Sequence, residues 1–327
     1  MGKYILKRLL YVIPSIIIIS FISFLLIDLP PGTFADTVAA EMMESGGVTR
    51  EAIEAIEERY GLNQPTVVQY WKWVTGIILR GDFGKSFIWD RSVESVMWDR
   101  LGHTLILTGG AFIFVCLMSI PIGIYSAVRQ YSMGDYMFTS LGFLGLAIPN
   151  FLFALVLMYI GFRYLDQSIG GFYSPEFAKA PMSFAKFLDL LSHLWIPIIV
   201  IGTEGTASLI RIVRANLLDE LLKPYVITAR AKGLSEIRLI LKYPVRIALI
   251  PFVATVGWML PQLISGATIV SVVMSLPTTG PILLRALMGQ DMYLAASFIL
   301  MLSVLTVIGT LISDILLAII DPRIRFS

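Results

Sequence analysis

The stretch "YVITARAKGL", residues 225–234, decides the fold, because it is a short basic segment between two long apolar runs. Pro224 before it suits the first turn of a helix, where a missing backbone N–H costs nothing. Gly233 suits the left-handed residue that ends a helix. Ser235 then predicts the N-cap of a second short helix, "EIRLILKY", which Pro244 ends. We therefore expect a helix, a glycine turn and a second helix, neither long enough to cross a bilayer; such a basic helix fits a groove of another protein or a surface of anionic lipid headgroups.

The rest of the chain has the composition of a membrane protein. Of its 327 residues, 57% are hydrophobic and 15% are charged, and the mean hydropathy is +0.80. A soluble domain carries about a quarter charged residues. The net charge of +2 is too small to indicate a nucleic-acid partner.

Six apolar runs predict an all-α membrane protein with six transmembrane helices, since about 20 apolar residues span a bilayer. The first run is longer than the apolar region of a signal peptide and precedes no small-residue cleavage site, so we expect an uncleaved span. Five prolines, at 14, 121, 149, 197 and 261, lie in or near spans and are candidates for kinks. The expected spans are Leu9–Leu29, Thr104–Val128, Met137–Phe162, Leu194–Val213, Ala248–Met274 and Leu294–Ile320.

Lys and Arg predict the orientation, because short loops rich in these residues stay on the cytoplasmic side. With the N-terminus inside, the inside segments and Arg211 hold 14 of the 25 Lys and Arg residues. Both termini are therefore expected in the cytoplasm. The expected divisions are a cytoplasmic N-terminus and first helix (1–30), an extracytoplasmic insert (31–103), a five-helix core (104–320) with a cytoplasmic loop (214–247), and a cytoplasmic tail (321–327).

The insert is expected to hold two helices. Thr49 is an N-cap candidate for the first, which Gly61 would end. Its acidic surface fits a solvated face or a docking surface for an outside partner. The second, "TVVQYWKWVTGIILRG", is amphipathic, and its Trp71 and Trp73 suit a membrane–water interface.

The motifs of common catalytic and metal sites are missing from the sequence. "GDFGKSF", residues 81–87, contains Gly-Lys-Ser, but Leu79 stands where a phosphate-binding loop has its first glycine, so we expect a structural turn. There is no HExxH and no GxSxG. The single cysteine, Cys116, and two distant histidines, His103 and His193, form no metal pattern. We therefore expect no catalytic residue, no metal and no cofactor on this chain.

Ionisable side chains within spans usually face a protein interior or a watery path, because charge in a bilayer is costly. Glu204 lies near the middle of the fourth span, and Arg211, two turns along the same face, would help to keep it ionised. With Pro261 of the fifth span they are the candidates for a translocation path; structural pairing or a protonated Glu204 is the alternative. A structural ion pair is expected near the end of the last span, among Asp314, Asp321 and Arg323.

Four stretches resemble the ABC-importer permeases, specifically the dipeptide/oligopeptide permease family. "TARAKGLSEIRLILKYPVRIALIP" resembles that family's cytoplasmic loop, and "YILKRLLYVIPSIIIISFISFLL" its first span. "RYGLNQPTVVQYWKWVTGIILRGDFGKSF" resembles its outside insert, and "DILLAIIDPRIR" its C-terminal end. Together they cover most of the chain in the family's order.

The resemblance implies a type I importer permease in the cytoplasmic (inner) membrane. It implies four kinds of partner besides the lipid bilayer: a second, similar permease, two cytoplasmic ATPases that bind ATP and Mg²⁺, and an external substrate-binding protein. The wider importer pattern begins Glu-Ala-Ala, and the matching positions here are Ile227, Thr228 and Ala229, so the Glu is absent. The coupling helix that fits a cleft in the ATPase would comprise Tyr225, Ala229, Arg230, Ala231, Lys232, Gly233, Leu234 and Ser235.

The function that the resemblance implies is transport, with ATP hydrolysis left to partner subunits. Peptides are the family's default substrates, and oligosaccharides or nickel are the alternatives within the same architecture. A secondary transporter is the competing class, but it would show inverted repeats, and the sequence has no convincing internal repeat.

Overall fold

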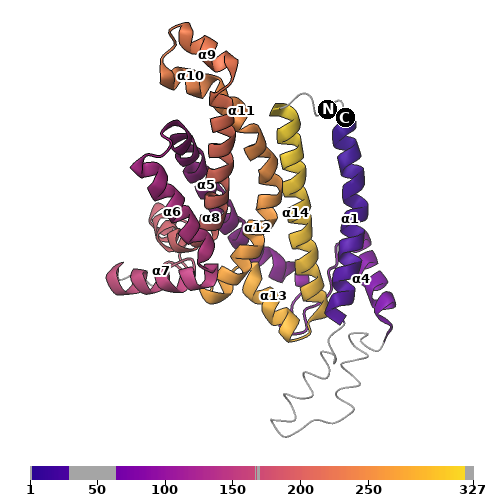
Figure 1. Cartoon of the computed structure of the whole chain (residues 1–327). Helices are drawn as coiled ribbons and strands as arrows, with labels where there is room; N and C mark the ends of the chain where they lie inside the picture. Colours follow the sequence, from indigo (N-terminus) through magenta and orange to yellow (C-terminus); the bar gives the residue numbers. More distant parts are fainter. Residues whose placement is uncertain (1, 29–63, 166, 168–169, 321–327) are drawn as a thin grey trace. The chain divides into compact units, whose positions relative to one another are not determined.

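The structure, a computed structural model, describes residues 2–28, 64–165, 167 and 170–320 (Figure 1). In these ranges it is all-helical, as predicted, and the only β pairing is an isolated bridge between Lys85 and Ser92. Its helices are α1 (Gly2–Asp28), α4 (Thr66–Arg80), α5 (Val93–Val128), α6 (Met133–Ala147), α7 (Asn150–Leu165), α8 (Phe184–Leu221), α9 (Pro224–Ala231), α10 (Glu236–Lys242), α11 (Pro244–Ala248), α12 (Ile250–Val273), α13 (Thr279–Met288) and α14 (Met292–Ile320).

Three of the described helices, α5, α8 and α14, are each long and apolar enough to cross a membrane. Two further spans follow if each of two bent helix pairs crosses as a unit. The described apolar part of α1, Leu10–Leu25, is shorter than these. Helix length and composition thus account for three to five spans, and six remains a prediction.

The predicted third span, Met137–Phe162, is wrong as a single helix. The chain turns by 109° between α6 and α7. The break lies at Pro149, which has no N–H to continue the helix and disfavours helical backbone at the residue before it. Ile148 accordingly has extended backbone, with φ −88° and ψ 123°. Each half has 15 or 16 residues, about 23 Å, which is less than the hydrocarbon thickness.

The chain divides into two compact units, and the first comprises Met1–Leu6, Thr104–Pro277 and Thr306–Ser327. Its central element is α8, which packs against α6, α7, α11 and α12 (Figure 1). A Cβ on Gly145 of α6 would lie 2.3 Å from the Thr203 methyl of α8, so this glycine permits the close approach of the two helices. The core is mostly aliphatic, and its fully buried members include Leu107, Val115, Val200, Val213 and Val270.

The second unit comprises Lys7–His103 and Thr278–Leu305. Helix α4 confirms the predicted amphipathic helix, and Gly81 ends it with φ 67°. Only one of its two tryptophans faces outward: Trp71 is 60% exposed, whereas Trp73 is 4% exposed and packs against Phe24. Tyr70 shares a hydrogen bond of 2.9 Å with Ser20 of α1. The helix expected between Thr49 and Gly61 lies outside the described residues.

The Gly-Lys-Ser segment of the second unit is a turn closed by a buried aspartate. Asp291, with no exposed surface, accepts hydrogen bonds from Ser86 Oγ at 2.5 Å and from the Phe87 and Ile88 N–H groups at 2.9 and 3.1 Å. Burial raises the pKa of Asp291, and these hydrogen bonds act against that rise. Two of the backbone N–H groups after Lys85 are thus bonded within the protein, which fits the predicted structural turn.

Candidate functional site

The loop between α8 and α12 folds as two short helices with a turn at Gly233. Helix α9 begins at Pro224 and α10 begins after Ser235, which confirms both predicted helices. Gly233 has φ +79°, the left-handed backbone that ends a helix. Across the turn, Arg230 donates hydrogen bonds of 2.5 and 3.1 Å to the two Glu236 carboxylate oxygens. These bonds raise the pKa of Arg230 further above its already high usual value.

The inner face of this loop packs on the ends of α5 and α8. Tyr225 donates its hydroxyl to Glu220 of α8 at 2.6 Å, and burial together with this bond raises the pKa of Tyr225. Ala229 and Leu234 are half-buried against the same apolar cluster. The buried members of the cluster are Ala127, Leu217, Val226, Leu239, Ile240, Val245 and Ala248.

The outer face of the loop is exposed, and we call it the α9 face. Ile227 on it is 59% exposed, and a Cβ on Gly233 would meet no atom within 4 Å. Its basic, small and apolar side chains suit recognition by a groove in another protein. The α9 face comprises Lys223, Pro224, Ile227, Thr228, Arg230, Ala231, Lys232 and Gly233.

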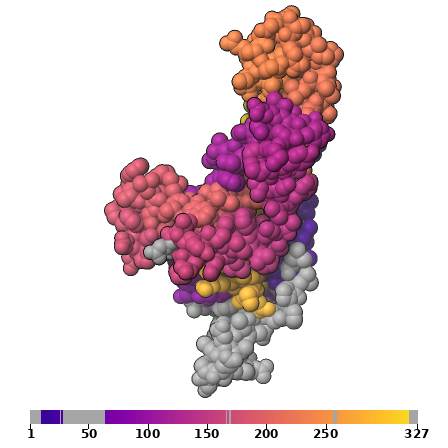
Figure 2. Space-filling view, turned by 60° about the vertical axis from the view of Figure 1, so that its left-hand side comes forward, coloured from indigo at the N-terminus to yellow at the C-terminus, as the bar shows by residue number. Residues whose placement is uncertain are grey.

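The predicted coupling residues therefore fall into two groups. Tyr225, Ala229 and Leu234 hold the loop on the long helices. The others are exposed, and they are Arg230, Ala231, Lys232, Gly233 and Ser235. In Figures 1 and 2, α9 and α10 form one end of the first unit, beyond α11.

An ion pair near the start of the loop was missed by the sequence reasoning. Arg214 of α8 donates hydrogen bonds of 3.1 and 2.9 Å to the two carboxylate oxygens of Asp135, at the start of α6. The Asp135 side chain is 4% exposed and also accepts the Tyr131 N–H at 2.9 Å. The local signal was present, because Ser132 followed three residues later by an acid is typical of a helix start. Its partner, Arg214, is 79 residues away, and a single sequence gives no signal that the two residues meet.

A second polar group joins three apolar helices of the first unit at Glu204. Gln262 Nε2 of α12 donates to one Glu204 oxygen at 2.9 Å, and Asn150 Nδ2 of α7 donates to the other at 3.4 Å. Glu204 is half-buried and Gln262 is exposed, so the group reaches the surface of the first unit. We call these three residues the Glu204 cluster.

The other predicted path residues lie around this cluster. Arg211 is exposed and forms no ion pair with Glu204 in the described part of the chain; its guanidinium lies 6.0 Å from the centroid of the Phe143 ring. Pro261 is next to Gln262 and lacks the N–H that would bond the carbonyl of Gly257. The helical stretches Glu236–Thr255 and Met259–Val273 are bent by 55° relative to one another, so the bend lies before Pro261 and near the carbonyl that the proline leaves unbonded.

The predicted ion pair near the last span lies partly outside the described residues. Asp314 is in α14, whereas Asp321 and Arg323 are beyond the last described residue.

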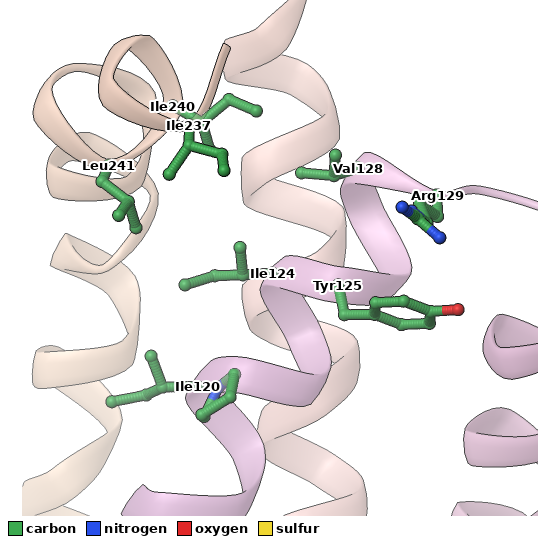
Figure 3. A pocket seen from close by; sticks show the side chains of 9 residues that line it. Ile120, Ile124, Tyr125, Val128, Arg129, Ile237, Ile240 and Leu241 are labelled. Atoms are coloured by element: carbon green, nitrogen blue, oxygen red, sulfur yellow. The ribbon is translucent and has the colours of Figure 1, made fainter. Parts of the chain in front are cut away.

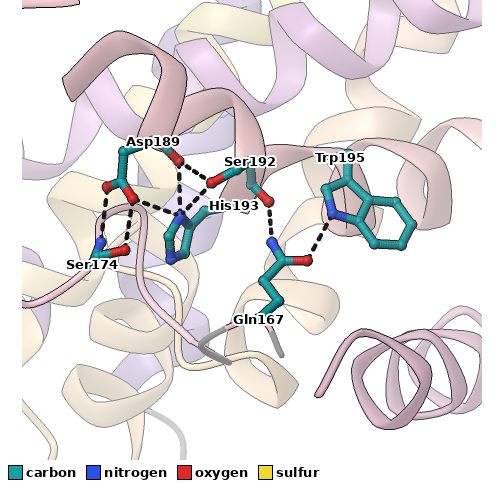
Figure 4. A network of polar contacts seen from close by, with 6 residues as sticks. All are labelled: Gln167, Ser174, Asp189, Ser192, His193 and Trp195. Atoms are coloured by element: carbon teal, nitrogen blue, oxygen red, sulfur yellow. Dashed lines mark hydrogen bonds and ion pairs between the residues drawn. The ribbon is translucent and has the colours of Figure 1, made fainter. Parts of the chain in front are cut away.

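A Ser-His-Asp group at the start of α8 has the residue types of a hydrolase but not its geometry (Figure 4). His193 Nδ1 lies 2.8 Å from the Asp189 carbonyl oxygen and 3.2 Å from Ser192 Oγ. A triad needs the acid on Nδ1 and the serine on Nε2, whereas here Asp189 Oδ1, at 3.7 Å, and Ser192 both lie on the Nδ1 side. The Asp189 carboxylate bonds Ser174 N and Oγ at 2.9 and 2.6 Å. These hydrogen bonds therefore hold the segment around Ser174 against the start of α8.

The fold and the exposed loop define a multi-pass α-helical membrane protein that presents a recognition surface beyond its long helices. Residues 119–326 match the family described as "Binding-protein-dependent transport system inner membrane component". Residues 1–108 match the N-terminal region of such membrane components. The chain belongs to this family of inner-membrane transport permeases, which are not enzymes.

Full-length relatives support this assignment. The chain is 36% identical to the oligopeptide transport system permease protein AppB of Bacillus subtilis, over all 327 residues of both chains. It is 31% identical to the oligopeptide permease OppB of Haemophilus influenzae, and 31% identical to the glutathione permease GsiC of Salmonella typhimurium. Each of these matches covers 100% of both chains.

Proposed function

We propose that this chain is the permease subunit of an ABC importer for peptides and forms half of the translocation path. Its relatives over their whole length are named oligopeptide and glutathione permeases, which favours short peptides as the substrate class. The second half of the path would come from another, similar permease. An external binding protein would deliver the substrate.

The observation that carries the proposal is the exposed α9 face on a loop that is anchored from behind. Two cytoplasmic ATPases would bind ATP and Mg²⁺, and one would receive this face in a cleft. Because Tyr225 bonds Glu220 and Val226 is fully buried, a push on α9 would pass to α8 and α5 through packed side chains. That movement would tilt the spans between outward and inward access.

The proposal requires the loop to face the cytoplasm. It therefore includes six spans, two cytoplasmic termini and an extracytoplasmic insert. The Lys and Arg distribution supports this orientation, since the α8–α12 loop is among the most basic short segments of the sequence.

The coupling role is tested at Gly233, where two substitutions separate the backbone from the side chain. A Cβ there has open space, so the obstacle is only the left-handed φ of +79°. Asn adopts this backbone readily, whereas a β-branched residue does not. We expect Gly233→Val to release the ATPase or to uncouple ATP hydrolysis from uptake, and Gly233→Asn to retain both. Normal uptake and normal ATPase binding in Gly233→Val would contradict the role of this loop in coupling to the ATPase.

The alanines of the loop provide a second, matched comparison. Ala231→Trp places a large side chain on the exposed face, so we expect a folded protein that co-purifies with less ATPase. Ala229→Trp adds the same volume against the loop's own core, which typically costs about 1–3 kcal/mol. We expect it to lower the melting temperature as well. Equal melting temperatures in the two variants would contradict the placement of Ala231 on the exposed face and of Ala229 against the loop's core.

We also propose that the Glu204 cluster lines the path. Two neutral amides add no positive charge to the cluster, so a ligand cation would be the first to pair with the carboxylate, and the amino group of a peptide is the complementary partner. Glu204→Gln should reduce uptake strongly while the complex still assembles. The double variant Glu204→Gln with Gln262→Glu is the matched control, because it moves the acid within the cluster instead of removing it, and we expect it to retain more uptake than Glu204→Gln. Unchanged uptake kinetics in Glu204→Gln would exclude a path role.

The substrate class is tested with the cognate binding protein and reconstituted transport. We expect peptides to bind and to be transported, and oligosaccharides and nickel to fail. Uptake should stop when the partner ATPase is inactivated. Uptake driven by an ion gradient alone would instead assign a secondary transporter.

A further inference from the structure

One face of α8 carries polar and small residues that the neighbouring helices leave open. Residues spaced i, i+4, i+7 and i+11 share a helical face, and we call the four on this face the α8 stripe: Glu204, Ser208, Arg211 and Ala215. The first two are half-buried and the last two are exposed, although α6 and α12 both pack on α8 (Figure 1). Charged groups within a span usually face a watery path or another protein.

The two charged members of the α8 stripe line small clefts against different helices. Glu204 lines a cleft of about 10 Å³ together with Gln262 and Gly266 of α12. Arg211 lines a cleft of about 20 Å³ together with Phe143 of α6. A space of this size holds about one water-sized group. The clefts therefore fit the charged ends of a ligand rather than its body.

Neither charge is neutralised by the other or by a neighbour within the described residues. Arg211 forms no ion pair with a carboxylate there, and its nearest aromatic partner is the Phe143 ring, 6.0 Å from the guanidinium. The Glu204 oxygens accept only from the uncharged amides of Asn150 and Gln262. The α8 stripe thus presents an anion and a cation, each open to a charged ligand.

The separation of the two charges indicates the length of a complementary ligand. Arg211 follows Glu204 by seven residues, which is about 10 Å along the helix axis at about 1.5 Å per residue. An extended peptide advances about 3.3–3.6 Å per residue, so about three residues bridge this separation. Ser208, between the two charges, has a small side chain and leaves room for a peptide backbone along α8.

The larger pocket of the first unit lacks such a pair of charges. It has a volume of about 450 Å³ and opens between α5 and α10, with Ile124, Ile237 and Leu241 on its walls (Figure 3). Among the described residues that line it, Arg129 is the only charged one. This pocket therefore offers no acid for an ammonium group, and the clefts on α8 are the better match for a zwitterion.

We propose that the α8 stripe binds both ends of a short peptide and favours peptides of about three residues. Glu204 pairs with the ammonium group, and Arg211 pairs with the terminal carboxylate through its planar guanidinium. This inference rests on the proposed function, in which the Glu204 cluster lines the path. It adds Arg211 as the residue that selects a free carboxyl end. The rest of the wall around the peptide would come from the second permease.

A direct test measures binding without transport. Ser208→Cys, in a Cys116→Ser background, places a thiol between the two charges of the full-length protein, studied in the complex with which it purifies. The rate of modification by a small water-soluble methanethiosulfonate is measured without nucleotide and with ATP. We expect trialanine to slow modification severalfold in one of these states, and N-acetylated and C-amidated trialanine to have little effect. No modification in either state, or equal protection by the three peptides, would overturn the proposal.

Reconstituted uptake then tests the role of Arg211. Arg211→Gln should lower uptake of trialanine about tenfold relative to C-amidated trialanine, since it removes one charge-assisted pair. The binding protein is unchanged, so a change in this ratio belongs to the permease. Arg211→Lys should restore part of the preference. Arg163→Gln is the matched control, because Arg163 also lies over a ring, at 5.9 Å from the Tyr164 centroid, but at the end of α7.

Peptide length gives a further check, because an extended six-residue peptide is too long for both clefts. Its uptake should be the same in Arg211→Gln and in the unsubstituted protein. An equal loss of free, amidated and six-residue peptides in Arg211→Gln would contradict the α8 site while ATP-driven uptake still supported the proposed function. Protection of the thiol by trialanine without ATP-driven uptake would instead contradict the proposed function alone.

Discussion

The Arg214–Asp135 pair is the most buried ion pair at the base of the loop, and its two members are not equivalent. The Asp135 side chain is 4% exposed, whereas that of Arg214 is 27% exposed. Removal of one partner of a buried pair is costly because the other charge remains desolvated. Water reaches the guanidinium but hardly reaches the carboxylate, so the loss of Arg214 is the more damaging change.

We therefore expect Arg214→Met to destabilise the protein by about 3–5 kcal/mol, in the range found when a buried pair is broken. Asp135→Asn should cost less, because its carbonyl oxygen can still accept from Arg214. Thermal unfolding of the two variants and of the double variant in detergent checks this order. A larger loss in Asp135→Asn would show that the carboxylate is better solvated than its burial indicates.

Asp291 gives a second prediction at the residue scale. It accepts Ser86 Oγ and two backbone N–H groups with one oxygen, and the Leu294 N–H at 3.3 Å with the other. Asp291→Ala would leave these donors buried without an acceptor, at about 1–3 kcal/mol each. We expect faster proteolysis of the 82–92 segment and a lower melting temperature. Asp82→Asn, an exposed aspartate that accepts one N–H in the same turn, should change neither.

The sequence singled out Glu204, because an acid within a span is unusual, but it did not predict which side chains bond it. An i, i+7 spacing correctly places Arg211 on the same helical face, yet the arginine lies over Phe143. The atoms that bond Glu204 come from Asn150 and Gln262, 54 and 58 residues away. Such contacts depend on how α7 and α12 are rotated against α8, and a single sequence carries no direct signal of that rotation.

At the scale of elements, the loop helices were predictable because Pro224, Gly233 and Ser235 each fix a backbone conformation locally. The break at Pro149 was harder to predict. Four other prolines lie in or near spans, and all four, Pro14, Pro121, Pro197 and Pro261, lie inside helices. Proline marks a possible kink, and the surrounding packing decides its size.

Pro149→Ala tests whether proline itself causes the 109° turn. Alanine supplies the missing N–H and permits helical backbone at Ile148. Spin labels at Tyr136 and Phe162, in a Cys116→Ser background, would lie about 39 Å apart along a continuous helix and much closer in the bent one. We expect the distance measured by pulsed electron resonance to increase or to become broad. An unchanged distance would mean that packing alone holds the bend.

The break also concerns function, because Asn150 is the first residue of α7 and bonds Glu204. Helix straightening would withdraw this amide from the cluster. Asn150→Ala, which keeps the proline, separates the two effects: it should disturb uptake without changing the distance between the labels.

At the scale of the whole molecule, the proposed function depends on which side of the membrane holds the α9–α10 loop. The loop must meet cytoplasmic ATPases, and the insert must meet an external binding protein. Two exposed lysines can show on which side of the membrane each element lies. Lys72 is in α4 of the insert, and Lys232 is at the turn after α9. Their substitution by cysteine is the same chemical change in both elements.

We expect Lys72→Cys, in a Cys116→Ser background, to react with a membrane-impermeant maleimide in spheroplasts. Lys232→Cys should react only after permeabilisation, because the basic loop is held inside by the charge rule. Gln130→Cys, in the exposed turn between α5 and α6, should behave like Lys232→Cys. If both lysine positions reacted in intact spheroplasts, the number of spans between them would be even rather than odd, and the loop would lie where no ATPase could reach it.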